Sequence, residues 1–323
     1  MRIRELSLFL FVMIISTLIV FTIMKQSPMA SYVTAVKSSI TGENVKLIIE
    51  QKALEENEPS IDARTDPIWG NIPGYDGLVI DTETIYQITQ KQKKKNFIPS
   101  IYMEEEAKVK LDDLKPNPIY RGNAAKPMIS LMINVAWGTE HLQSMLDTLN
   151  KYNIQCTFFL DGSWANKNQE LIKEMHNSGH EIGNHAYSHP SMSKLSVERM
   201  KEEIVKTEQV IEAAIGKKTI LFAPPSGDFN EKVVSVAHNH GYKTILWTLD
   251  TVDWQKPTSD VIIQRIVPKA SNGALVLMHP TESTAIALPK MIEQLQQKGF
   301  YLGTVSEMLS SKRLLPIEDI FSF

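Results

Sequence analysis

The chain has 323 residues, of which 43% are hydrophobic, and its formal net charge is −3 at pH 7. This length provides a substantial core in one large domain or two modest ones, and the charge gives no electrostatic basis for binding nucleic acid. The single cysteine, Cys156, excludes an intrachain disulfide and a cysteine-rich zinc site. Its apolar neighbours in QCTFFL indicate a small core residue rather than a nucleophile.

Residues 1–30 have the pattern of a membrane anchor. Arg2 and Arg4 precede an uncharged apolar stretch from Leu6 to Met24, and a spanning helix needs about 20 such residues. Basic residues stay on the cytoplasmic side, which places the rest of the chain outside. We therefore expect a single-pass membrane protein with a cytoplasmic N-terminus and its main domain on the cell-wall side. The alternative is a secreted protein whose signal is cleaved after Ala35.

Residues 31–125 are mixed and predict a stem with a small α+β subdomain. A turn at Pro73–Gly74 precedes a short strand, LVID, and a helix that Asp81 or Thr82 could cap. The basic run Lys91–Lys95 is typical of a solvated face, with an anionic wall polymer or lipid surface as the alternative contact. Three prolines in residues 110–127 indicate a linker.

From residue 126 to about 312, apolar strands alternate with amphipathic helices. Residues 128–135, MISLMINV, predict a strand. Residues 139–153 predict a helix with one apolar face, formed by Leu142, Met145, Leu146 and Leu149. Further strands are predicted in residues 155–162, 180–185, 218–227, 242–250, 273–280 and 301–309, and further helices in residues 169–179 and 196–216. Repeated βα units predict an α/β fold with a parallel sheet or a (β/α) barrel, followed by a tail over residues 313–323.

In such folds, active-site residues lie at the carboxyl ends of the strands. That rule selects Trp137, Asp161, His185, Pro225, Asp250 and His279.

His185 and His189 are four residues apart in HAYSH. On a helix, or in a turn held by Pro190, both imidazoles could bind one metal ion. Zinc accepts two histidines but needs at least one more protein ligand for a typical catalytic site, and surface helices produce the same spacing by chance.

Three further segments could carry chemistry. Asp253, beside Trp254 in DTVDW, is either a turn carboxylate or the group that orients a catalytic histidine. His279 is either a rim residue or the proton donor to a leaving amine, because a histidine pKa lies near working pH. The rigid loop FAPPSG is either a stiff turn or an element that aims a backbone N–H at an oxyanion.

Five blocks in order, CTFFLDG, GHEIGNHAYSHPSMSKLS, FAPPSGDFN, GYKTILWTLDTVDW and GALVLMHP, resemble the polysaccharide deacetylases, carbohydrate esterase family 4, over residues 127–309. The anchor and the stretch IDARTDPIWGNIPGYDGLVID are similar to its sporulation-associated branch. The resemblance implies a distorted (β/α) barrel that removes acetyl groups from N-acetylated sugars in polymers such as peptidoglycan. It also implies zinc or cobalt held by two histidines and an aspartate, a second aspartate as general base and a histidine as general acid.

Several positions match this pattern. His185 and His189 match the metal histidines, His279 the general acid and Asp253 the carboxylate that tunes it. The resemblance places the substrate pocket at Trp137, Pro225, Ser226, Trp254 and Leu277.

Other positions depart from it. Ala136 occupies the position of the family's general base, and Trp137 that of its metal-binding aspartate. Ala223 replaces the arginine that holds the base, and Ser226 replaces a tyrosine. General base catalysis contributes about 10²–10⁴ in rate, and loss of a carboxylate ligand weakens the metal site. We therefore expect deacetylation to be abolished or strongly impaired, leaving a glycan-binding module in which Trp137 and Trp254 grip sugar. The alternative is a working peptidoglycan N-deacetylase with an altered site, in which Asp161 or Asp250 substitutes.

Overall fold

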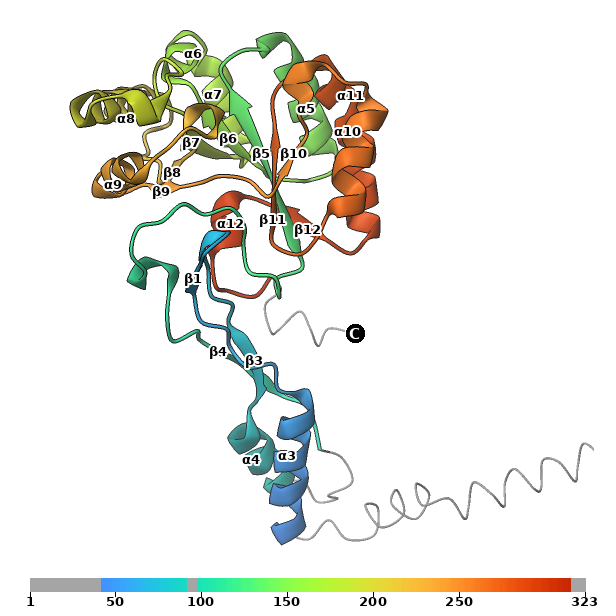
Figure 1. Ribbon diagram of the computed structural model, residues 1–323. Helices are drawn as coiled ribbons and strands as arrows, with labels where there is room; N and C mark the ends of the chain where they lie inside the picture. Colours follow the sequence, from blue (N-terminus) through green and yellow to red (C-terminus); the bar gives the residue numbers. More distant parts are fainter. Residues whose placement is uncertain (1–41, 92–97, 315–323) are drawn as a thin grey trace, which may run out of the picture. The chain divides into compact units, whose positions relative to one another are not determined.

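A computed structural model describes residues 42–91 and 98–314 (Figure 1). These residues form two compact units, one of residues 42–58 and 78–104 and the other of residues 59–77 and 105–314. The predicted anchor over residues 1–30 and the end of the tail, residues 315–323, lie outside the described residues. Within the described ranges, no helix has the length and apolar character needed to cross a membrane.

The smaller unit is built from two helices and two strands. These are α3 (Gly42–Glu56), β3 (Gly77–Ile80), α4 (Thr82–Lys91) and β4 (Tyr102–Glu105), with β3 and β4 paired. Its apolar core comprises Val45, Ile49, Ile80 and Ile85. Asp81 Oδ1 accepts a hydrogen bond from Thr84 N at 3.0 Å, so Asp81 caps α4 as one of the two predicted candidates.

The larger unit contains an eight-stranded sheet with β5 at its centre. Its strands are β5 (Met128–Val135), β6 (Thr157–Leu160), β7 (Glu181–Asn184), β8 (Leu221–Phe222), β9 (Lys243–Thr244), β10 (Leu249–Asp250), β11 (Ala274–Met278) and β12 (Tyr301–Gly303). All pair in parallel, which confirms the predicted α/β class. Among the described residues the order runs β10-β11-β5-β6-β7-β8-β9, so the two edge strands do not pair and the barrel stays open.

Helices follow most strands, as βα units require. They are α5 (Thr139–Lys151), α6 (Gly162–Lys167), α7 (Gln169–Asn177), α8 (Val197–Ile215), α9 (Glu231–Asn239), α10 (Ser259–Ile266), α11 (Glu282–Gln297) and α12 (Val305–Leu309). Residues 301–309 were predicted as one strand, but the strand ends at Gly303. The reason is a capping box, in which Thr304 and Glu307 each satisfy a backbone N–H of the other and so start α12.

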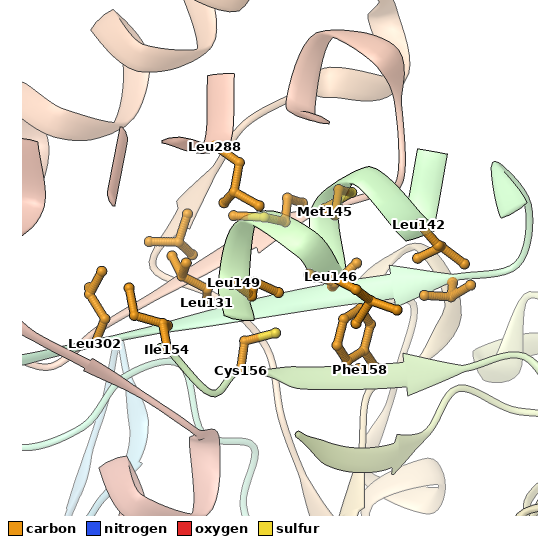
Figure 2. Close-up of a cluster of buried hydrophobic side chains, with 14 of the residues drawn as sticks. Leu131, Leu142, Met145, Leu146, Leu149, Ile154, Cys156, Phe158, Leu288 and Leu302 are labelled. Carbon is orange, nitrogen blue, oxygen red and sulfur yellow. The ribbon is translucent and has the colours of Figure 1, made fainter. Parts of the chain in front are cut away.

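Both faces of β5 are buried, which explains its uninterrupted apolar sequence. Ile129, Leu131, Ile133 and Val135 pack into the cluster that includes the helices (Figure 2). Leu142, Met145, Leu146 and Leu149 of α5 are all at most 1% exposed in that cluster, as their spacing predicted. On the opposite, inner face, Met128 and Met132 pack with Phe159 and Leu277.

Part of the predicted stem belongs to the larger unit. The hairpin of β1 (Arg64–Asp66) and β2 (Gly70–Ile72) connects to the sheet through Ile119, which bridges both Gly70 and Ile245. Ile119 N donates to Thr244 O at 2.9 Å, and Leu246 N donates to Ile119 O at 2.8 Å. Backbone pairing therefore carries this unit beyond the boundary at residue 126 that the proline-rich sequence suggested.

Candidate functional site

A cavity of about 450 Å³ lies at the carboxyl ends of the strands. Its lining consists of Asn134, Trp137, His189, Ser226, Trp247, Asp250, Trp254, Leu277 and His279. Six of these nine residues, all but Asn134, Trp247 and Asp250, are site residues that the resemblance selected. The cavity therefore brings together segments that are 145 residues apart in the sequence.

The other predicted residues lie behind or beside this lining. His185 and Asp253 are at most 1% exposed and contact residues of the cavity wall. Pro225, Ala136 and Ala223 are not part of the lining. Sequence reasoning missed Asn134 and Trp247. The signal for Asn134 was available, because it shares strand parity with the inward-facing Met132.

Trp137 is held in place by the turn that follows β5. Gly138 has φ +77°, and a Cβ atom there would lie 1.9 Å from Pro280 O, so only glycine permits this approach. The contact brings the turn against the residue that follows His279. As a result the Trp137 and His279 rings stack, with centroids 5.7 Å apart and planes at 8°. Trp137 remains 45% exposed, so one part of its indole covers the histidine while another part faces solvent.

His279 retains a complete set of supporting contacts. Its Nδ1 donates to Asp253 Oδ1 at 2.7 Å, which leaves Nε2 as the ring nitrogen available to the cavity. Asp253 Oδ2 accepts from His279 N at 2.6 Å and from Thr284 Oγ1 at 2.7 Å. Burial alone would raise the pKa of Asp253, but the hydrogen bonds and charge of His279 outweigh it and the pKa lies below its usual value. This pair can hold or move a proton at Nε2.

His185 and His189 lie on an irregular turn rather than a helix, so the turn alternative is the one observed. Ala186 and His189 adopt positive φ values of 60° and 54°. This turn brings the rings of His185 and His189 together, with centroids 5.2 Å apart. His185 Nδ1 donates to Ala223 O at 2.7 Å, which leaves its Nε2 free to act as a ligand. Burial, with His189 nearby, lowers the pKa of His185 to about 3, so the ring is neutral.

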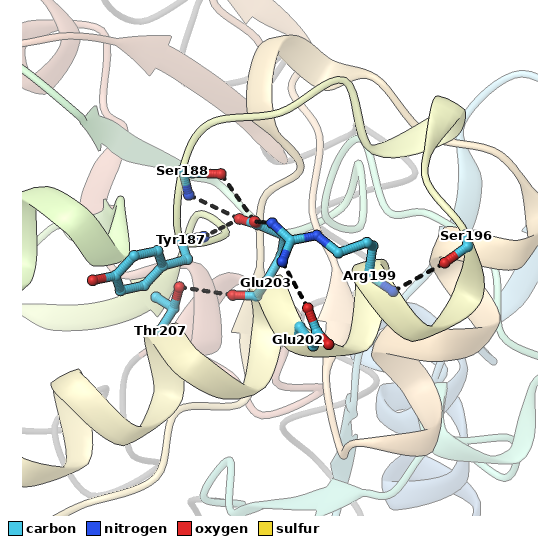
Figure 3. A network of polar contacts seen from close by, with 7 residues as sticks. All are labelled: Tyr187, Ser188, Ser196, Arg199, Glu202, Glu203 and Thr207. Atoms are coloured by element: carbon cyan, nitrogen blue, oxygen red, sulfur yellow. Dashed lines mark hydrogen bonds and ion pairs between the residues drawn. The ribbon is translucent and has the colours of Figure 1, made fainter.

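Glu203 on α8 fixes this turn (Figure 3). Its carboxylate is only 2% exposed. It accepts hydrogen bonds from Tyr187 N at 2.9 Å, from Ser188 N at 2.8 Å and from Ser188 Oγ at 2.9 Å. Arg199 pairs with it at 2.8 Å. A strained turn persists only when its surroundings hold it, and Glu203 supplies that constraint between the two histidines.

Asp161, which the strand-end rule selected, caps a helix. Its Oδ1 caps α6 by accepting from Trp164 N at 2.9 Å, and it also accepts from Ser163 Oγ at 2.6 Å. Its Oδ2 is buried and has no hydrogen-bond partner among the described residues. Burial raises the pKa of this carboxyl, and the side chain does not line the cavity.

Ser226 lies in the short turn η3 (Pro225–Gly227) with φ +54°. A Cβ atom at Gly227 would approach the Trp247 ring to 2.7 Å, so this turn packs directly on that indole. Ser226 and Trp247 therefore form one wall of the cavity. Trp254, in the turn η4 (Asp253–Gln255), is 55% exposed and forms part of the lining as well.

The donor set does not form a complete metal site. Across residues 42–91 and 98–314, no three His, Cys, Asp or Glu side chains lie close enough together to hold a metal ion. His185 and His189 offer two donors, and the resemblance assigns the third ligand to the position of Trp137. A catalytic zinc site needs three protein ligands and an open position, so the described residues do not fit one.

Residues 121–245 match the polysaccharide deacetylase family. The chain is 42% identical over 314 residues to YlxY of Bacillus subtilis, an uncharacterized protein, covering 96% of this chain and 97% of that one. It is 30% identical over 199 residues to a peptidoglycan-N-acetylglucosamine deacetylase of Bacillus cereus, covering 60% and 72%. The chain therefore belongs to the polysaccharide deacetylase family, carbohydrate esterase family 4, whose deacetylases are generally metal-dependent.

Solved structures support the same family assignment. The crystal structure of BA3943 from Bacillus anthracis, described as a CE4 family pseudoenzyme, is 41% identical with a TM-score of 0.76, covering 83% of this chain and 96% of that one. A BA3943 mutant described as having restored enzymatic activity matches at 40% identity with the same TM-score, covering 83% and 99%. The open parallel barrel is therefore the architecture of this family.

Proposed function

We propose that this protein binds N-acetylated glycan of the cell wall, such as peptidoglycan, and that its deacetylase activity is abolished or strongly impaired. The observation that carries the proposal is the end of β5. Ala136 and Trp137 stand where the resemblance places the base and the metal carboxylate, and Trp137 stacks on His279 with centroids 5.7 Å apart. The remaining proton-transfer pair, Asp253 and His279, has no base or complete metal site to work with.

Two further findings support glycan binding without turnover. Trp137 and Trp254 are 45% and 55% exposed on the cavity lining, where indole faces can cover the apolar surface of a sugar ring. The relatives include peptidoglycan deacetylases and a pseudoenzyme that regains activity in a mutant form. We infer that zinc or cobalt binds weakly through His185 and His189, because the third ligand is missing.

The test measures binding and turnover on the same samples. We expect the full-length protein to bind N-acetylglucosamine oligomers in calorimetry, to release no acetate from them, and to contain substoichiometric metal. The B. cereus peptidoglycan-N-acetylglucosamine deacetylase is the positive control. Acetate release at a comparable rate would establish the alternative, a working deacetylase with an altered site. Absence of binding would overturn the glycan-binding proposal.

The proposed location is the outer face of the membrane, with residues 1–30 as the anchor. The support is Arg2 and Arg4 before the uncharged stretch Leu6–Met24. We expect the full-length protein in the membrane fraction and its main domain to be digested by protease added to intact protoplasts. Protection from the protease would contradict this orientation. The similarity to the sporulation-associated branch suggests a role in sporulation, which the spore yield of a deletion strain tests.

A further inference from the structure

The charge of the cavity lining bears on which form of sugar the cavity accepts. Its lining contains one carboxylate, Asp250, and no lysine or arginine. The cationic groups it could carry are the imidazoles of His189 and His279, and His279 is already paired with Asp253. The Arg265 guanidinium donates to the Thr251 carbonyl and is not part of the lining.

Asp250 is positioned to act on a ligand. It lies at the end of β10, is half-buried, and its Oδ1 accepts from Val252 N at 2.7 Å. No ion pair to this carboxylate is found in the part of the chain that the structure describes, so Oδ2 remains available as an acceptor.

A second acceptor is present without a partner. Asn134 is 3% exposed and lines the cavity, and its Oδ1 accepts no hydrogen bond from any described residue. This oxygen is itself buried from solvent, so it does not face a ligand in the cavity. The groups that a ligand meets include the Asp250 carboxylate, the Ser226 hydroxyl and the indole rings of Trp137 and Trp254.

We propose that the preferred ligand is a glycan containing a de-N-acetylated hexosamine, whose protonated amine enters this cavity. This inference rests on the proposed glycan binding and specifies the form of the sugar. An ammonium group supplies three donors and a positive charge, which match Asp250 Oδ2 and the aromatic faces. An acetamido group carries no charge, so it gains at most one N–H hydrogen bond from the Asp250 carboxylate. A cavity of about 450 Å³ is large enough for one such residue.

The experiment compares glucosamine tetramer with N-acetylglucosamine tetramer by calorimetry, using the full-length protein at a pH where the amine is protonated. We expect the de-N-acetylated tetramer to bind about tenfold more tightly, which corresponds to about 1.4 kcal/mol. Asp250→Asn should remove this preference, and an unchanged Tm and far-UV circular dichroism spectrum of the variant would report that it is folded. Asp147→Asn, at an exposed carboxylate on α5, is the matched control and should keep the preference.

The outcomes separate the two proposals. Equal or tighter binding of the N-acetylated tetramer by the wild type would overturn the amino-sugar inference and leave glycan binding intact. Loss of the preference in Asp147→Asn to the same extent as in Asp250→Asn would also overturn it, because the preference would then come from the overall negative charge. If neither tetramer binds, both proposals fail.

Discussion

Glu203→Ala tests how the histidine turn is held. The change removes the acceptor of Tyr187 N, Ser188 N and Ser188 Oγ together with the partner of Arg199. Each lost hydrogen bond to a charged, buried group costs about 1.5–3 kcal/mol. Ser188 is exposed and can bind water instead, and the Arg199 side chain is 56% exposed, so its ion pair adds at most about 1 kcal/mol. We expect the free energy of unfolding to fall by about 3 kcal/mol.

That loss corresponds to about 6–12 °C in Tm for a domain of this size, measured by calorimetry. The matched control is Glu202→Gln, which removes the 61% exposed partner of the same Arg199 and should change stability by less than about 0.5 kcal/mol. Hydrogen exchange supplies a local readout, because the amides of Tyr187 and Ser188 should exchange faster in Glu203→Ala alone. Equal melting of the two variants, or unchanged exchange at these amides, would refute the assigned role of Glu203.

Two further predictions concern the backbone turn and a buried charge. Gly138→Ala should lower the free energy of unfolding by about 2–4 kcal/mol, because the added Cβ meets Pro280 O and φ is positive. The control Gly216→Ala, with φ +68° but open space around it, should lower it by only about 1 kcal/mol. Equal losses for the two variants in urea unfolding would contradict the contact with Pro280. Lys126 is 2% exposed and donates to Glu307 O and Ser310 O, and burial lowers its pKa to about 8 from 10.5. Since the folded state then binds fewer protons than the unfolded state, the stability of the wild type relative to Lys126→Met should rise by about 3 kcal/mol between pH 8 and 10.5. Parallel pH profiles of the two proteins would show that the Lys126 pKa is not depressed.

Local patterns in the sequence were sufficient to predict the main elements of the larger unit. The apolar run of β5 and the spacing of Leu142, Met145, Leu146 and Leu149 depend on burial within one element, and the structure has both as predicted. The helix α12 was missed because its start depends on a capping box, which outweighs the apolar composition of residues 301–309. The motif itself, Thr304 followed three residues later by Glu307, is local and could have been read from the sequence.

The sequence predicted most residues of the candidate site, but not the contacts between them. The motifs selected His189 and His279, which line one cavity. The stack of Trp137 on His279 depends on the approach of Gly138 to Pro280, two residues 142 positions apart, and no local pattern encodes that contact. The pairing of Ile119 with Ile245 is non-local in the same way, which is why the hairpin before it was assigned to the stem.

The central claim is that carboxylates missing at positions 136 and 137 silence an otherwise retained deacetylase groove. The most direct measurement is acetate release from N-acetylglucosamine oligomers, with zinc content, for the wild type and the double variant Ala136→Asp, Trp137→Asp. The second aspartate would complete a three-ligand site with His185 and His189, and the first would supply the base. We expect near-stoichiometric zinc and a rate at least about 10²-fold above that of the wild type, with no gain in the control Trp137→Phe. A wild type already as active as the double variant, or a double variant that is loaded with zinc and inactive, would contradict the claim.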